Sequence, residues 1–333
     1  MKRLVILSPN WLGDAVMALP ALADVRRGAP SVSIAIAARP AIAPLFSLVP
    51  GVDETIVLPA SSLRDVTGWR GLGDELAGRD FDTALLFPNS MQSALRVSRA
   101  GIPERWGYRT DWRGRLLTRA VEPIRGSHQV SSYQHLVKAL GFSNGSSEPR
   151  VSVPQASHQA ASDLLLKEGW DGRAPLVALA PGAAYGGAKR WPPEYFGELA
   201  QALSNYGVGC VLVGSPADAT AAAAVMRTSA AARVHNLIGR TDLPTLCGVF
   251  THCRTLVTND SGAMHLAAAA GVGVTAVFGP TDDTATHPLG DAHAVLTHPV
   301  WCRPCMLREC PLDHACMRGV GVPAVLASAR RTL

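Results

Sequence analysis

The sequence predicts an α/β protein built from two doubly wound domains, each with a parallel sheet between layers of helices. Short aliphatic runs alternate with longer helical patterns, and this alternation restarts after a polar stretch near residues 143–157. Runs that are apolar almost throughout are typical of parallel strands, which are buried on both faces. A length of 333 residues also exceeds what one small core usually needs. We expect an N-terminal domain over residues 1–165, a C-terminal domain over residues 170–320, and a last helix over residues 321–333 that packs back on the first domain.

The strands of both domains are expected at the apolar runs. In the first domain these runs cover residues 4–7, 33–38, 54–59 and 82–88. In the second domain they cover residues 176–182, 210–215, 235–239, 255–260 and 274–279. Ligands of open parallel sheets bind at the carboxyl ends of the strands. We therefore look for the chemistry in the segments that follow these runs.

The composition fits a soluble globular protein, because 47% of the residues are hydrophobic and 17% are charged. No run of eighteen or more apolar residues occurs, which disfavours a membrane-spanning helix. The apolar N-terminus is broken by polar residues and by Pro9 and Gly13, which a secretory signal would not tolerate well. We expect a cytoplasmic protein whose chain begins with a strand, a loop and a helix.

Two acidic residues stand where a helix is expected to begin after a strand. Asp14 lies in SPNWLGDAVMALPAL, and Asp218 lies in VGSPADATAA. An aspartate at such a position commonly caps the helix by accepting hydrogen bonds from free N–H groups. At the ligand-binding edge of a sheet, Asp14 could instead act as a general base. Asp218 could hold the hydroxyl groups of a ribose, and both interpretations stay open for each residue.

The loop APGAAYGGAKRWP, residues 180–192, follows the first strand of the second domain. Gly182 and the other small residues let the backbone approach a ligand closely, and Lys189 and Arg190 supply positive charge. This combination suits a phosphate or a diphosphate. The loop is neither a Walker A motif nor a GxGxxG fingerprint, which disfavours a kinase or a dinucleotide oxidoreductase. A surface turn with solvated cations is the other interpretation.

The segment TNDSGAMHLAAAAG, residues 258–271, is expected to form a strand end, a short loop and a helix start. The N–H groups around Ser261 and Gly262 would face a bound anion, which the helix dipole also favours. Asp260 would cap the turn or meet a hydroxyl group. His265, one turn into the helix, could donate to a phosphate oxygen or simply pack among the alanines.

Basic residues concentrate between Arg96 and Arg125, where eight arginines oppose Glu104, Asp111 and Glu122. These charges leave +5 in this segment, which equals the formal net charge of the whole chain. Nucleic acid is a disfavoured partner, because no aromatic-interleaved or helix-in-groove motif accompanies the arginines.

The seven cysteines fall into two groups. Three stand in apolar contexts and are most simply buried thiols: Cys210, Cys247 and Cys253. Four gather near the C-terminus, with His314 among them: Cys302, Cys305, Cys310 and Cys316. Such density can make a structural zinc or iron–sulfur site, although the second CxxC of a finger is missing. Reduced thiols in a loop are the other interpretation.

Together the motifs resemble the ADP-heptose:lipopolysaccharide heptosyltransferases of glycosyltransferase family 9, most closely the heptosyltransferase II members. The resemblance is carried by SPNWLGDAVMALPAL, LLFPNSMQSAL with AGIPERWGYR, PGAAYGGAKRWPPEYFGELA and TNDSGAMHLAAAAGVGVTAVFGPT. It implies a GT-B fold, in which two Rossmann-like domains face a central cleft. The first domain would bind the acceptor and the second the nucleotide-sugar donor. A departure is Ala184, where the loop of similar family members carries glutamate, which puts one donor contact in doubt.

The resemblance implies an inverting transfer of L-glycero-D-manno-heptose from ADP-heptose to the heptose I residue of the lipopolysaccharide inner core in a Gram-negative cell. No metal or other cofactor would take part in catalysis. Asp14 matches the proposed catalytic base, and Met264 would lie near the adenine and Asp218 near the ribose. The donor diphosphate would be bound by Gly182, Lys189, Asp260, Ser261, Gly262 and His265.

The resemblance also implies a lipid A–Kdo–heptose acceptor, whose phosphates and carboxylates guanidinium groups bind well. The candidates for this contact are Arg96, Arg105, Arg109 and Arg113. Peripheral contact with the cytoplasmic face of the inner membrane would follow. The alternatives are heptosyltransferase I or another family member with a different acceptor, a GT-B-type nucleotide-sugar epimerase or hydrolase, and a non-catalytic nucleotide-binding module.

Overall fold

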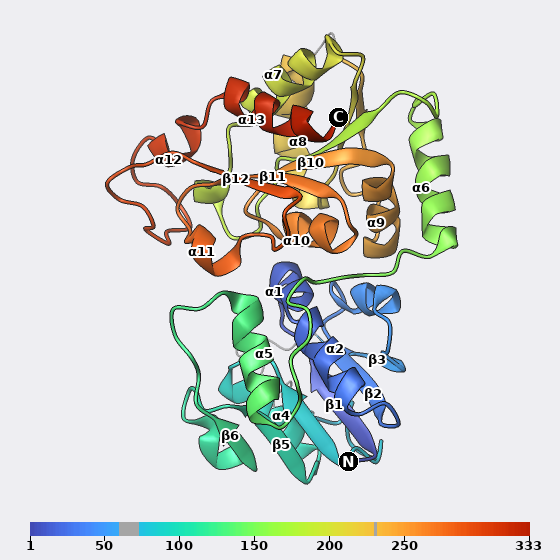
Figure 1. Cartoon of the computed structure of the whole chain (residues 1–333), viewed down its shortest axis with the longest axis vertical. Helices are drawn as coiled ribbons and strands as arrows, with labels where there is room; N and C mark the ends of the chain where they lie inside the picture. Colours follow the sequence, from blue (N-terminus) through green and yellow to red (C-terminus); the bar gives the residue numbers. More distant parts are fainter. Residues whose placement is uncertain (60–72, 230–231) are drawn as a thin grey trace. The chain divides into compact units, whose positions relative to one another are not determined.

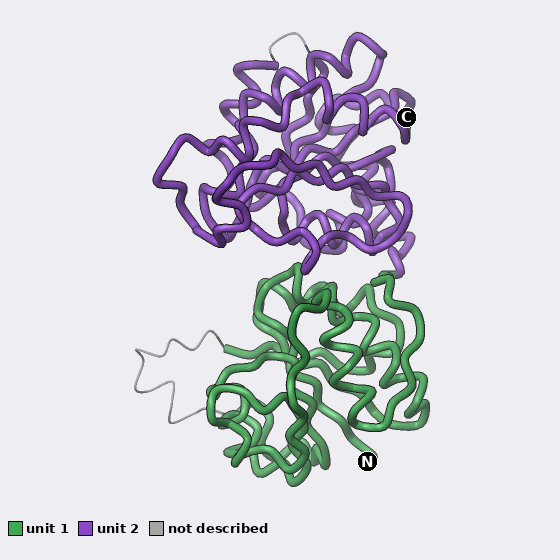
Figure 2. Tube along the Cα trace, turned by 60° about the vertical axis from the view of Figure 1, so that its left-hand side comes forward, with its two compact units in different colours: residues 1–151 green, residues 152–333 purple. Residues whose placement is uncertain are grey.

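The computed structural model describes residues 1–59, 73–229 and 232–333. The chain forms two compact units, Met1–Val151 and Ser152–Leu333, which Figure 2 shows in green and purple. Each unit is built around its own six-stranded sheet, in which every strand pairing is parallel.

The sheet of the first unit has the strand order β3-β2-β1-β4-β5-β6. The strands are β1 (Arg3–Leu7), β2 (Ser33–Ala38), β3 (Glu54–Val57), β4 (Thr83–Leu86), β5 (Glu104–Tyr108) and β6 (Arg119–Val121). The central strand β1 is fully buried at Leu4, Val5 and Ile6. This burial on both faces is the reason why its sequence is apolar without alternation.

The helices of the first unit connect these strands (Figure 1). They are α1 (Leu12–Met17), α2 (Leu19–Gly28), α4 (Met91–Arg99) and α5 (Gln129–Ala139), with 3-10 turns η1 (Ala43–Leu48) and η2 (Arg113–Leu116). Pro20 stands in the first turn of α2, where its missing N–H costs no hydrogen bond. Ser90 caps α4, because its side chain accepts a hydrogen bond from the N–H of Ser93.

The sheet of the second unit has the order β12-β11-β10-β7-β8-β9. The strands are β7 (Leu176–Ala180), β8 (Gly209–Leu212), β9 (Val234–Asn236), β10 (Cys253–Asn259), β11 (Gly273–Phe278) and β12 (His293–Thr297). When the strands of each unit are counted along the chain, both sheets have the doubly wound order 3-2-1-4-5-6. The predicted fold class is therefore confirmed.

The helices of the second unit are shown in Figure 1. They are α6 (Gln155–Lys167), α7 (Pro193–Ser204), α8 (Ala219–Thr228), α9 (Leu243–Thr251), α10 (Gly262–Ala269), α11 (Asp283–Thr286), α12 (Ala315–Arg318) and α13 (Val322–Ala329). The 3-10 turns are η3 (Gly187–Lys189), η4 (Pro216–Asp218) and η5 (Arg330–Thr332).

The division between the units falls between Val151 and Ser152, earlier than the boundary at residue 165 expected from the sequence. The reason is that α6 packs against α9 of the second unit. Ala161 and Leu165 of α6 are fully buried. A Cβ at Gly248 in α9 would lie 2.2 Å from the carbonyl oxygen of Ser157, so only glycine allows this close approach.

The C-terminal helix α13 packs against α7, β10 and β11. Val325 and Ala329 of α13 are fully buried and join the core cluster of Phe196 and Leu199. The segment expected to pack back on the first domain therefore contributes to the core of the second unit. Among the described residues, no helix combines the length and the apolar character needed to cross a membrane.

Candidate active site

The register of the second sheet brings the carboxyl ends of three strands together. Ala180 at the end of β7 pairs with Thr258 of β10, and Asn259 of β10 pairs with Val277 of β11. The segments that continue from these strands therefore start side by side at one edge of the sheet. This is the edge where open parallel sheets bind their ligands.

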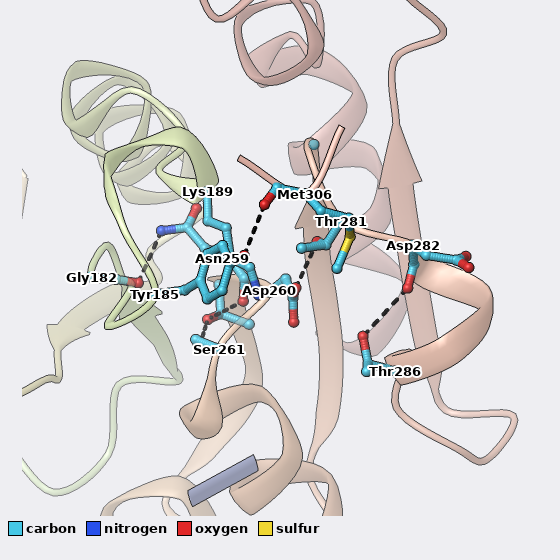
Figure 3. A network of polar contacts seen from close by, with 12 residues as sticks. Gly182, Tyr185, Lys189, Asn259, Asp260, Ser261, Thr281, Asp282, Thr286 and Met306 are labelled. Atoms are coloured by element: carbon cyan, nitrogen blue, oxygen red, sulfur yellow. Dashed lines mark hydrogen bonds and ion pairs between the residues drawn. The ribbon is translucent and has the colours of Figure 1, made fainter. Parts of the chain in front are cut away.

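Asn259 fixes both ends of the loop that follows β7. Its carboxamide nitrogen donates to the carbonyl oxygens of Pro181 at 2.9 Å and Gly182 at 3.1 Å, as Figure 3 shows for Gly182. Its carboxamide oxygen accepts a hydrogen bond from the N–H of Trp191 at 2.9 Å. Asn259 is fully buried, so these bonds do not compete with water. The sequence interpretation missed this role, since Asn259 entered there only as part of the segment 258–271, expected to form a strand end, a loop and a helix start.

Lys189 and Asp260 form an ion pair at the same edge. The Lys189 Nζ lies 2.5 Å from Asp260 Oδ2, and the two side chains are only 13% and 7% exposed. The hydroxyl of Thr281 donates to the same carboxylate oxygen at 2.7 Å (Figure 3). The ion pair links residues that lie in different loops, and no local sequence pattern signals it. Asp260 thus partners a cation, a role beyond the turn cap or hydroxyl contact expected for it.

The start of α10 lies directly after this carboxylate. Ser261 is the N-cap residue, and its hydroxyl lies 3.0 Å from the hydroxyl of Thr258. Gly262 is the first helical residue. The first N–H groups of a helix lack partners within the helix, and the dipole makes this end favourable for an anion.

Met264 and His265 are placed on the same helix but lie deeper. Met264 is fully buried and His265 is 5% exposed. Both side chains thus contribute to the packing of α10. Their contacts with the adenine and the diphosphate stay predictions.

Asp218 lies against the loop after β7. Its Oδ2 accepts hydrogen bonds from the N–H and the hydroxyl of Ser215, which closes a capping box at η4. A Cβ at Gly182 would lie 2.2 Å from Asp218 Oδ1, so the missing side chain makes room for the carboxylate. The structure therefore brings Asp218 to the strand-end site, as a cap and as a neighbour of the loop.

The four C-terminal cysteines line one cavity, together with Ala188, Pro280 and Trp301. All four are free thiols. Burial and the proximity of the other three thiols raise the pKa of Cys316. Across the described ranges, no group of three or more histidine, cysteine, aspartate and glutamate side chains is arranged to hold a metal ion. As they stand, the thiols do not fit the zinc or iron–sulfur site considered from their spacing.

Asp14 stands in the first turn of α1, directly after β1 of the first unit. Its carboxylate is partly exposed and lies close enough to α5 to affect Tyr133. Burial, with the negative charge of Asp14 as a further cause, raises the pKa of Tyr133. A half-buried carboxylate at the carboxyl end of a parallel strand is well placed to accept a proton from a ligand.

Arg113 is fully buried, which the sequence does not signal because arginine is almost always exposed. Its guanidinium donates to the Tyr108 carbonyl at 2.9 Å, to the Ser93 hydroxyl at 3.0 Å and to the Asn89 side chain at 3.2 Å, and it also donates to the Pro88 carbonyl. Burial lowers its pKa to about 10. Arg113 therefore holds the segment after β4, and it presents no surface to an acceptor.

The other three predicted acceptor arginines differ in exposure. Arg96 is buried and paired with Glu75. Arg105 donates to the carbonyl oxygens of Ile102 and Pro103 before β5 and of Leu116 at the end of η2. Arg109 has a side chain that is 62% exposed, and it pairs with Glu122 at 3.2 Å. Of the four candidates, Arg109 is the most exposed residue.

Two Rossmann-like units, with a basic loop and a helix start at the strand ends of the second, are the features of an α/β protein of the GT-B type. The chain belongs to glycosyltransferase family 9 (heptosyltransferase), whose family model matches residues 69–316. It is therefore a glycosyltransferase.

Known proteins support this assignment over almost the whole chain. Lipopolysaccharide heptosyltransferase 2 of Salmonella typhimurium is 31% identical over 308 residues, which are 88% of this chain and 87% of that protein. The structure of E. coli ADP-heptose lps heptosyltransferase II matches with a TM-score of 0.82 and 29% identity, covering 100% of this chain and 98% of that one. E. coli heptosyltransferase WaaC with ADP matches in fold, with a TM-score of 0.76, 19% identity and coverage of 99% and 100%.

Proposed function

We propose that this chain transfers L-glycero-D-manno-heptose from ADP-heptose to the heptose I residue of the lipopolysaccharide inner core, with inversion at the anomeric carbon. The observation that carries the proposal is the cluster at the strand ends of the second unit. There the loop after β7, with Lys189, is bonded to Asp260 and Asn259 beside the start of α10. The name of the relative with 31% identity supports the acceptor.

In this proposal the second unit binds the diphosphate of the donor. The N–H groups of Ser261 and Gly262 would face the phosphate oxygens, and Lys189 would lie beside them. As the bond between the heptose and ADP breaks, negative charge grows on the leaving diphosphate. Hydrogen-bond donors that are held in position before the reaction stabilise this charge without having to reorganise. Such electrostatic stabilisation is commonly the largest single contribution to catalysis.

We assign to Asp14 the role of the general base that removes the proton of the acceptor hydroxyl. Its carboxylate would accept this proton while the acceptor oxygen attacks the anomeric carbon, and the electron pair of the broken bond would leave with ADP. A positioned general base contributes a factor of about 10² to 10⁴ in rate. The exposed Arg109 would contact an anionic group of the acceptor, since a guanidinium binds phosphate and carboxylate groups well.

The lipid A portion of such an acceptor is anchored in a membrane. We therefore infer that the enzyme works in the cytoplasm at the inner face of the inner membrane, in peripheral contact with the lipid surface. Cosedimentation with vesicles that contain the acceptor, compared with vesicles that lack it, measures this contact.

The test is transfer from ADP-heptose to lipid A–Kdo acceptors that carry no heptose, one heptose or two heptoses. The proposal predicts a product with the one-heptose acceptor alone, and the one-bond carbon–proton coupling constant at the new anomeric centre reports inversion. A product with the heptose-free acceptor would make the chain a heptosyltransferase I. Absence of transfer to all three acceptors would contradict the proposal.

A further inference from the structure

The positive charge of Lys189 is compensated within the second unit. Its ammonium group lies 2.5 Å from the carboxylate of Asp260, and both side chains are nearly out of solvent. The pair as a whole is neutral, so it offers a diphosphate a dipole and a set of N–H donors. A leaving group with growing negative charge is stabilised best by positive groups aimed at it. A further cation at this edge would therefore strengthen donor binding.

The cysteine-rich segment after β12 crosses the loop that carries Lys189. The hydroxyl of Tyr185 in this loop donates to the carbonyl oxygen of Met306 at 2.8 Å (Figure 3). The N–H of Met306 in turn donates to the carbonyl oxygen of Pro280 at 2.9 Å. Met306 thus joins the loop after β7 to the segment after β11.

The backbone of Arg308 is bound directly to the same loop. The N–H of Ala188 donates to the carbonyl oxygen of Arg308 at 2.9 Å, and the N–H of Gly187 donates to Glu309 Oε1 at 2.9 Å. A Cβ at Gly186 would lie 2.2 Å from the Arg308 carbonyl oxygen, so a side chain at this position would prevent the crossing. The position of Arg308 is therefore set by the loop itself.

The side chain of Arg308 shares an aromatic partner with Lys189. The Arg308 Cζ lies 5.2 Å from the ring centroid of Tyr185, and the Lys189 Nζ lies 4.7 Å from the same centroid. Arg308 is exposed, and within the ranges that the structure describes no ion pair joins it to a carboxylate. A cation–π contact at an exposed site is worth about 0.5–1 kcal/mol, so it orients the guanidinium without consuming its N–H donors.

We propose that Arg308 is an anion-binding residue of the donor site, and that its guanidinium contacts the diphosphate of the nucleotide sugar. It supplies a net positive charge, which the neutral Lys189–Asp260 pair lacks. Its planar fork can donate two parallel hydrogen bonds to phosphate oxygens, both to the bound donor and to the departing ADP. This inference rests on the proposed function, since it assumes a diphosphate donor.

The experiment is a calorimetric titration of the full-length protein with ADP, compared with adenosine, which lacks the phosphates. Arg308→Ala should raise the Kd for ADP about tenfold, because one charge-assisted contact is lost. The Kd for adenosine should stay unchanged. Arg308→Lys should recover part of the ADP affinity, because it keeps the charge and loses the fork. The matched control is Arg318→Ala, another exposed arginine of the same segment, which should not change the Kd for ADP.

The outcomes separate the inference from the proposed function. If the wild-type protein does not bind ADP, the proposed donor is wrong. If the wild-type protein binds ADP and Arg308→Ala binds it as tightly, the role of Arg308 is wrong and the proposed function stands. If Arg308→Ala weakens adenosine and ADP equally, the residue acts on the shape of the loop and the contact with phosphate is disproved.

Discussion

The loop after β7 and the segment between Arg96 and Arg125 are both basic in sequence, and the structure uses their charges in different ways. In the loop, Lys189 is paired with a carboxylate that lies on the same strand-end edge as the helix start. In the arginine-rich segment, Arg96, Arg105 and Arg113 are held in buried or partly buried contacts, and Arg109 forms an exposed ion pair with Glu122. The number of cations in a segment thus overstates the charge that a ligand meets.

The contrast is sharpest between two arginines that are four positions apart. The side chain of Arg109 is 62% exposed, whereas Arg113 is fully buried and donates to Tyr108 and to four residues of the segment after β4. Arg113 holds that segment in place, whereas Arg109 is the residue proposed to contact the acceptor. Substitutions should therefore separate stability from binding at the two positions.

The largest effect on stability is expected at the ion pair of the second unit. Lys189→Met leaves the carboxylate of Asp260 nearly buried, with Thr281 as its one remaining side-chain donor among the residues that the structure describes. Removal of one partner of a buried pair costs about 3–5 kcal/mol. The free energy of unfolding, measured by urea titration, should fall by about this amount, and the Kd for ADP should rise.

The double variant Lys189→Met with Asp260→Asn is the control for this prediction. It removes the uncompensated charge and should recover part of the free energy of unfolding while ADP binding stays weak. If Lys189→Met alone were as stable as the wild-type protein to within 1 kcal/mol, the pair would contribute nothing to the fold.

A smaller effect is expected at Arg113 in the first unit. Arg113→Met removes a set of buried hydrogen bonds and leaves the carbonyl of Tyr108 with fewer donors, which should cost about 2–3 kcal/mol. Arg109→Ala is the matched control, and its free energy of unfolding should stay within about 0.5 kcal/mol of the wild-type value. Arg109→Ala should instead raise the KM for the acceptor. Equal destabilisation by both substitutions would break the comparison between the two residues.

The sequence predicted the fold class and nine of the twelve strands that the structure describes, but it did not predict β5, β6 and β12. Apolar runs such as that of β1 are long enough to mark buried parallel strands, and the expected fold class was correct. Lys189 and Asp260 were both selected as site residues, because each follows a strand of the second sheet. Their pairing could not be predicted, since it depends on the register that aligns β7 with β10.

Other features had no local signal in the sequence. Asn259 looks like any polar residue before a helix, and only the fold shows that its carboxamide fixes the loop at two ends. The burial of Arg113 is equally invisible, because the carbonyl groups that satisfy it belong to separate segments. Arg308 contacts the loop after β7 because Gly186 has no side chain to keep the backbone of Arg308 away. No periodic pattern in either segment indicates this contact.

The central claim is that the second unit binds the donor while Asp14 of the first unit acts on the acceptor. The most direct measurement is the rate of heptose transfer in a single turnover by Asp14→Asn, made beside the Kd of the same variant for ADP. The account predicts a rate lower by a factor of about 10² to 10⁴ and an unchanged Kd. A variant that transfers heptose at the wild-type rate, or that loses its affinity for ADP, would contradict the assignment of Asp14 as the base.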